Sequence, residues 1–181
     1  MSLLGKRYAS ALLSIAIENN CIEQYKSDLE NLIYHYSTVP EFEPFINNPH
    51  ITKEDKKKTV CKILGEDSDI KFLNFVQILI DKERFKDIYD IFENYKVLAN
   101  EYQNIILIKV TSAIELENEE IEKIKEKYKN EYKGYKLEVE NIVDKNILGG
   151  LKIQIGDKII DATLKTKLND LKNYMLNENK I

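Results

Sequence analysis

Three aspartates in the C-terminal third of the chain have the chemistry to hold a metal ion. Asp144, Asp157 and Asp161 lie around a predicted hairpin, and clustered carboxylates can bind Mg²⁺ for phosphoryl transfer. Between them, Gly149-Gly150 resembles the start of a phosphate-binding loop. However, the pattern G-x-x-x-x-G-K-[ST] is absent and no helix is predicted directly after the glycine pair. Aspartates beside tight turns usually stabilise the turn, so we favour a structural role for all three.

The other candidates for chemistry are two cysteines and two histidines. Cys21 and Cys61 are far apart in helical, apolar-flanked segments, which favours reduced, buried thiols over the alternative of a disulfide. His35 and His50 are expected at the surface. No C-x-x-C or H-x-x-x-H spacing exists, and two histidines give no Ser/His/Asp or Cys/His arrangement. The sequence therefore predicts no metal and no cofactor, with catalysis kept only as an alternative.

The distribution of charge argues against a nucleic-acid partner. The first 100 residues contain 13 basic and 16 acidic side chains, and the rest contain 14 and 15. Binding to phosphates needs a basic region, and neither half supplies one. The run Lys56-Lys57-Lys58 has Glu54 and Asp55 beside it, so we expect it to form a solvated helix face.

The N-terminus imitates a secretion signal. Lys6-Arg7 precedes an apolar run, but Glu18-Asn19-Asn20 follows without a small-residue cleavage site, so we expect a retained helix. No apolar run approaches the roughly 18 residues of a membrane span. We expect a soluble protein that reaches a membrane only through partners.

The periodicity of apolar residues divides the chain into two unlike regions. Residues 1–103 have helical periodicity throughout. Residues 104–181 contain a strand at 104–113, a charged helix at 117–132 and a second strand at 137–143. Alternation in 151–155 and the Gly-Asp turn that follows predict a hairpin, and a helix ends the region. The predicted fold class is α+β: a helical bundle followed by a small C-terminal α/β domain with a short sheet and hairpin.

Two predicted helices, within 3–18 and 70–81, are apolar on nearly every side. A helix of this kind is either central in a core or docks something else. Because a bundle of about 100 residues has room for one wholly interior helix, two such helices predict an exposed hydrophobic groove between them. An amphipathic partner helix would fill that groove. The alternative that both helices are simply buried stays open at this point.

The run from Ile142 to Leu168 resembles the C-terminal signature of the ATP synthase delta subunit family, the bacterial counterpart of the mitochondrial oligomycin-sensitivity-conferring protein. The matching pairs, in order, are Val143-Asp144, Gly149-Gly150, Gly156-Asp157 and Ile160-Asp161. The chain departs from the family at Ala162-Thr163, where Gly-Ser is usual. Loss of that glycine suggests that the turn into the last helix needs no positive φ.

The resemblance implies an N-terminal six-helix bundle that holds the N-terminal helix of an ATP synthase alpha subunit between its first and fifth helices. The runs 8–12 and 75–79 look like the family's motifs in those two helices. The expected partner-facing residues are Tyr8, Ala11, Ile15, Phe75 and Ile78. The expected core-facing residues are Leu12, Ala16, Phe72, Val76 and Leu79.

The resemblance also implies a function. We expect a non-catalytic stator component of the proton-translocating ATP synthase, in which residues 1–103 bind the catalytic head and residues 104–181 bind b-type peripheral stalk subunits. The charged helix and Lys165–Lys172 are candidate stalk contacts. The protein would be peripheral to the cell membrane on its cytoplasmic side. The coupling ion stays open, and the alternative is a helical-bundle adaptor of another complex.

Overall fold

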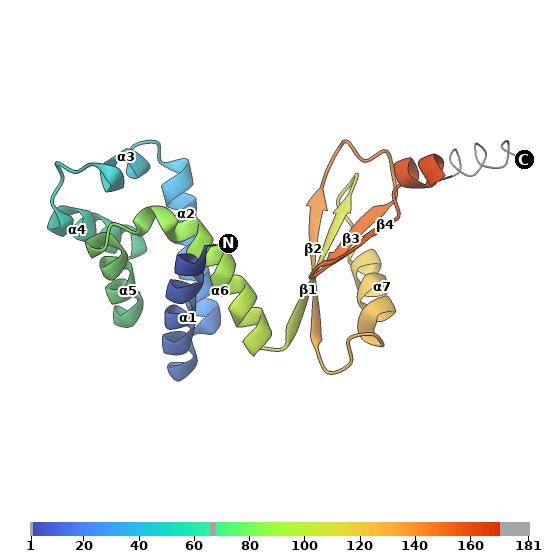
Figure 1. Cartoon of the computed structure of the whole chain (residues 1–181), viewed down its shortest axis with the longest axis horizontal. Coiled ribbons are helices and arrows are strands. Elements are labelled where there is room, and N and C mark those ends of the chain that lie inside the picture. The colour runs from blue at the N-terminus through green and yellow to red at the C-terminus, as the bar shows by residue number, and fades with distance from the viewer. Residues whose placement is uncertain (1, 66–67, 171–181) are drawn as a thin grey trace, which may run out of the picture. The chain divides into compact units, whose positions relative to one another are not determined.

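The computed structural model describes residues 2–65 and 68–170 (Figure 1). Its contacts divide the chain into two compact units, Met1–Ala99 and Asn100–Ile181, and the sequence placed the break after residue 103. The first unit is helical and the second contains the sheet. The predicted α+β fold class is confirmed.

The helical bundle has six α-helices among the described residues, as predicted. They are α1 (Leu3–Glu18), α2 (Ile22–Thr38), α3 (Phe42–Asn47), α4 (Lys53–Leu64), α5 (Ile70–Asp81) and α6 (Ile88–Tyr102), with the short 3-10 helix η1 (Phe85–Asp87) before α6. One apolar core joins them. Its largest fully buried side chains include Tyr25, Phe72 and Tyr95.

A close contact joins α1 to α6. The Ser2 side chain caps α1 by accepting a hydrogen bond from the Gly5 amide at 2.9 Å, and the Ser2 hydroxyl donates to the Asp90 carboxylate at 2.6 Å. A Cβ atom added at Gly5 would collide with that carboxylate. Glycine therefore lets the start of α1 lie directly against Asp90.

The second unit contains a four-stranded sheet of order β2-β1-β3-β4, formed by β1 (Ile105–Ser112), β2 (Lys136–Val143), β3 (Leu151–Ile155) and β4 (Lys158–Asp161). Strands β1 and β2 are parallel, and α7 (Asn118–Lys129) connects them. Strand β3 is antiparallel to β1 and forms the predicted hairpin with β4. Residues 164–170 are helical (Figure 1).

One face of this sheet is covered by α7. Alternate residues of β1 and β3 are buried there, and Ile124 and Tyr128 of α7 belong to the same core. On the opposite face, paired charges such as Lys109 and Glu140 are exposed or half-buried. The sheet is therefore half-covered, which explains the strict alternation seen in the sequence.

The paired glycines close the second unit. The amide of Leu164 donates to the carbonyl of Gly149 at 2.9 Å, so the chain before the last helix lies on the glycine turn. Gly150 has φ 82°, and a Cβ atom there would collide with the backbone of Ala162 and Thr163. Ala162 itself does not have positive φ, which confirms the sequence inference about the missing family glycine.

Among the described residues, no helix combines the length and apolar character that crossing a membrane requires.

Gly150→Ala should destabilise the second unit more than Gly156→Ala does. Both glycines have positive φ, 82° and 56°, but a Cβ atom at Gly156 meets nothing within 4 Å. We expect a loss of about 1 kcal/mol for Gly156→Ala from the left-handed backbone alone, and about 3 kcal/mol or more for Gly150→Ala, where the backbone must also move. Hydrogen exchange of β1 and β3 amides measures the unfolding of this unit separately. Equal losses would contradict the packing role of Gly150.

Candidate partner-binding site on helices α1 and α5

Helix α1 presents an apolar stripe beside its buried face. Leu12 and Ala16 are fully buried, as predicted. Tyr8 and Ile15 are half-buried and Ala11 is exposed. The spacing of three, four and seven residues places these three side chains on one flank of the helix.

Helix α5 is held with its apolar side inward. Phe72, Val76 and Leu79 are buried as predicted, at no more than 1% exposure. Of the two residues predicted to face a partner, Ile78 is 48% exposed and Phe75 is only 5% exposed. In the free chain, Ile78 is available to a partner, whereas Phe75 lies beneath the surface.

The structure brings the two predicted flanks together through an aromatic contact. The rings of Tyr8 and Phe75 meet edge to face, with centroids 6.5 Å apart and planes at 71°. The Lys71 amine also donates to the Asn19 side chain at 2.6 Å, which ties the start of α5 to the end of α1. Phe75 therefore supports Tyr8, and an apolar surface runs along the junction of the two helices.

Sequence reasoning missed one residue of this surface. Leu4 is half-buried and lies four residues before Tyr8, on the same flank of α1. The four-residue spacing between Leu4 and Tyr8 could have identified Leu4 from the sequence. The Lys71–Asn19 hydrogen bond had no such signal, because the two residues are distant in sequence.

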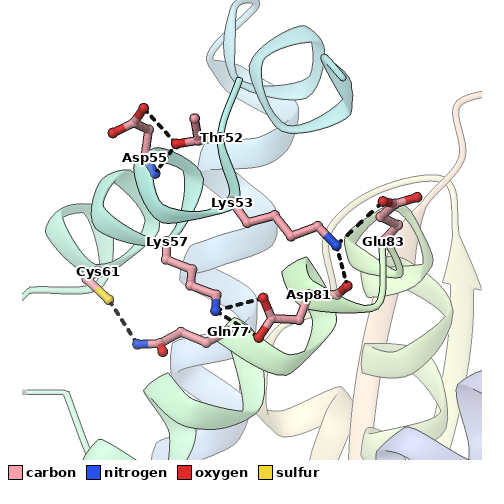
Figure 2. Close-up of polar contacts among 8 residues, drawn as sticks. All are labelled: Thr52, Lys53, Asp55, Lys57, Cys61, Gln77, Asp81 and Glu83. Carbon is pink, nitrogen blue, oxygen red and sulfur yellow. Dashed lines mark hydrogen bonds and ion pairs between the residues drawn. The ribbon is translucent and has the colours of Figure 1, made fainter. Parts of the chain in front are cut away.

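Helix α4 holds α5 from another side through polar contacts (Figure 2). The Lys57 amine lies 2.7 Å from the Asp81 carboxylate, and the Lys53 amine donates to the Asp81 carbonyl at 2.8 Å. Gln77 donates to the Cys61 sulfur at 3.7 Å. Gln77 and Asp81 form a polar line along α5 that faces α4, and the exposed Ile78 lies outside it.

A half-buried hydrogen-bond cluster fixes the start of α5. The Asp69 carboxylate accepts hydrogen bonds from the amides of Lys71 and Phe72 and from the Tyr25 hydroxyl. Burial alone would raise the pKa of Asp69, but these three donors outweigh it and lower the pKa. Burial raises the pKa of Tyr25, so its hydroxyl stays a donor.

Asp28 lies beside this cluster with an unsatisfied oxygen. Its Oδ2 atom is buried and has no hydrogen-bond partner among the described residues. Burial, followed by the negative charge of Asp69, raises the pKa of Asp28. The ionised form of Asp28 is therefore a destabilising feature of the bundle.

Two of the three aspartates considered for metal chemistry, Asp144 and Asp161, bond to their own turns. Asp144 accepts from the amide of Asn146 at 2.9 Å, and Asp161 accepts from the amide of Thr163 at 2.9 Å. The hydrogen bond from the Thr163 amide, followed by one from the Thr163 side chain, lowers the pKa of Asp161. Within residues 2–65 and 68–170, no group of three or more His, Cys, Asp or Glu side chains is placed to hold a metal.

The two cysteines are half-buried free thiols. The Cys61 sulfur accepts the hydrogen bond from Gln77 described above, and the Cys21 thiol donates to the Asn19 carbonyl at 3.1 Å. The sequence predicted buried thiols, and the structure places both only half-buried.

Comparison with known proteins decides the family. A family model described as ATP synthase delta (OSCP) subunit matches residues 4–175. A protein of Acetivibrio thermocellus named ATP synthase subunit delta is 38% identical over 176 residues, which cover 97% of this chain and 99% of that protein. The chain belongs to the ATP synthase delta (OSCP) subunit family.

Other members of the delta family agree with this assignment. Proteins named ATP synthase subunit delta from Trichodesmium erythraeum and Clostridium botulinum are 38% and 34% identical, and cover 89% and 96% of this chain. In turn, the alignments cover 88% and 96% of those proteins. The fold also matches a chain in the cryo-EM structure of the Toxoplasma gondii mitochondrial ATP synthase hexamer, with a TM-score of 0.72 at 18% identity, covering 97% of this chain and 98% of that one.

Asp28→Asn should stabilise this delta-family bundle at neutral pH and not in acid. The pKa of Asp28 in the folded chain is raised above its ordinary value of 3.8. The protonated carboxyl of Asp28 therefore stabilises the folded state at pH values below the unfolded pKa. This stabilisation is lost as the pH rises through the folded pKa. Asparagine cannot ionise, so the free energy of unfolding should rise by about 1 kcal/mol at pH 7 and hardly change at pH 3.

Urea unfolding of the full chain at the two pH values measures this difference. Glu30→Gln is the control, because Glu30 is an exposed carboxylate on the same helix. A gain of the same size at pH 3 and pH 7 would show that the Asp28 charge is not its cause.

Proposed function

We propose that this delta-family chain is a non-catalytic stator component of ATP synthase that holds the N-terminal helix of an alpha subunit along α1 and α5. The observation that supports it most directly is the uncovered apolar flank at that junction. Ala11 and the 48%-exposed Ile78 lie at the surface beside half-buried Tyr8 and Ile15. Buried Phe75 supports this surface from below.

The chemistry of the flank suits an amphipathic helix. Such a helix uses apolar side chains three and four residues apart, which match the spacing along α1. Small Ala11 lets a foreign backbone approach closely, and Tyr8 offers a large apolar ring with a polar end that can lie at the rim. A permanent joint needs affinity near the nanomolar range, about −12 kcal/mol, and desolvated apolar contacts supply this better than rim charges do.

The second unit supplies a separate surface for the b-type stalk subunits. Its uncovered sheet face has exposed Ile142 and Ile159 among charged pairs. Helix α7 is rich in charge on its outer side. The segment Lys165–Lys172, also expected at the stalk, runs past residue 170 and lies partly outside the described residues. Two small units with different surfaces suit a protein that joins two subunits.

In this proposal the chain performs no chemistry. It transmits force, because it prevents the catalytic head from turning with the rotor while ion flow drives ATP synthesis. It reaches the membrane only through the complex, on the cytoplasmic side of the cell membrane. Asp144 and Asp161, two of the three aspartates that had the chemistry for a metal site, bond to their own turns instead, which supports a mechanical role.

Tyr8→Asp should weaken binding of an alpha-subunit N-terminal peptide to the full chain by at least about 100-fold, or about 2.7 kcal/mol. The change places a charge on the apolar flank at a half-buried position, beside the buried Phe75 ring. Isothermal titration calorimetry measures the affinity. The wild-type chain should also show a large negative heat-capacity change on binding.

Ser10→Asp is the matched control. Ser10 is exposed on the same helix, away from the Tyr8 flank, so this variant should bind as the wild type does. Ile78→Asp repeats the test on α5, where Ile78 is exposed, and should also weaken binding. If Tyr8→Asp keeps its fold by circular dichroism and full affinity for the peptide, the groove assignment is wrong. If the wild-type chain does not bind the peptide, an adaptor role in another complex is favoured.

A further inference from the structure

A concave site lies in the helical unit, away from the residues assigned to the alpha-subunit helix. A cavity of about 470 Å³ opens where the end of α3, the start of α4 and the segment after α5 meet. Its lining residues are Ile46, Asn47, Pro49, Ile51, Thr52, Lys53, Lys56, Ile80, Glu83, Phe85 and Lys86. None of the five predicted partner-facing residues is among them. We call it the α3–α4 pocket.

The floor of the α3–α4 pocket is apolar. Ile46, Ile80 and Phe85 are buried in the bundle core and present one side to the cavity. Half-buried Ile51 and exposed Pro49 extend the apolar lining toward the surface. An apolar side chain placed here would lose contact with water on most of its surface, which is favourable.

The rim of the pocket is basic. Three lysines and one glutamate line it, but Lys53 is already engaged, since its amine lies 3.6 Å from the Glu83 carboxylate and bonds to the Asp81 carbonyl (Figure 2). The side-chain amines of Lys56 and Lys86 have no hydrogen bond or ion pair with any residue that the structure describes. Two positive charges without an ion-pair partner among the described residues therefore border a pocket with an apolar floor, in a chain whose net charge is −4.

We propose that the α3–α4 pocket docks a segment of a partner protein, with an apolar side chain on the floor and neighbouring carboxylates paired with Lys56 and Lys86. The arrangement of the lining distinguishes this occupant from a small molecule. Small-molecule sites place polar groups inside the cavity to orient the ligand. Here the floor is apolar and the charges are at the edge, which is the anatomy of a protein interface.

This docking site is independent of the proposed alpha-subunit groove. The pocket and the α1–α5 flank share helix α5 but no residue: Ile80 lines the pocket, and Ile78 belongs to the flank. A variant can therefore impair one without the other. The partner would be another chain of the ATP synthase assembly, recognised by an acidic segment with an exposed apolar residue.

The test measures binding of the full chain to ATP synthase of the same organism from which this subunit has been stripped. Lys56→Glu/Lys86→Glu should weaken binding about tenfold or more at low salt, and the loss should shrink at about 1 M salt. The control is Lys58→Glu/Lys62→Glu, which makes the same charge change at two exposed positions of α4 outside the pocket. The control should bind within about twofold of the wild type.

A photo-cross-linker in place of exposed Asn47, which lines the pocket, identifies the occupant. We expect a cross-link to a segment that contains an apolar residue flanked by Asp or Glu. Changing those carboxylates to lysine should restore binding of the Lys56→Glu/Lys86→Glu chain. Both double variants should still bind the alpha-subunit peptide with wild-type affinity, so failure of the groove proposal and failure of this one are distinguishable.

Three results would overturn the proposal. The first is equal affinity of the two double variants for the stripped complex. The second is a cross-link to a second copy of this chain or to a segment without carboxylates. The third is micromolar binding of dodecanoate that shifts the NMR signals of Ile51 and Phe85, which would assign the pocket to a small amphiphilic anion instead.

Discussion

The arrangement of the helical unit depends on how α5 is oriented. This helix is apolar on most of its circumference, so the hydrophobic effect alone would accept several rotations about its axis. Polar contacts select one of them. Asp81 and Gln77 bind partners on α4, and Asp69 at the helix start accepts three hydrogen bonds. With these groups satisfied, Ile78 and, at the helix start, Ile70 are the large apolar residues of α5 left exposed at the surface.

The contact between Tyr8 and Phe75 then links this orientation to α1. Phe75 is covered by the protein's own residues, and its ring edge supports Tyr8 at the boundary between core and solvent. The surface proposed for the alpha subunit is therefore a continuation of the bundle core. Rigid support of this kind limits the entropy lost when a partner binds.

The second unit solves a different physical problem. A small sheet with one uncovered face needs a firm closure at its edge, and the glycine pair supplies it through a backbone approach that no side chain permits. Helix α7 covers one face and leaves the other to pairs of opposite charges. The two units thus offer unlike surfaces, one apolar and one charged, which agrees with a protein that joins two different partners.

The sequence by itself determined the two-region α+β organisation, the hairpin and the core-facing residues of α1 and α5 other than Phe75. These follow from local periodicity and turn chemistry, because 3.6-residue and two-residue patterns fix which face of each element is buried. The sequence also predicted that Asp144 and Asp161 stabilise the turns in which they lie. In the structure, each accepts a hydrogen bond from the amide two residues ahead.

Only the tertiary structure decided how exposed the proposed site is and what else lies on the bundle. The burial of Phe75 depends on how α1 packs against α5. The division of the α5 polar line from its exposed flank depends on lysines of α4 that are more than twenty residues away in sequence. The α3–α4 pocket arises where three segments meet. Pairings of this kind carry no local signal, because they are set by the packing of whole elements.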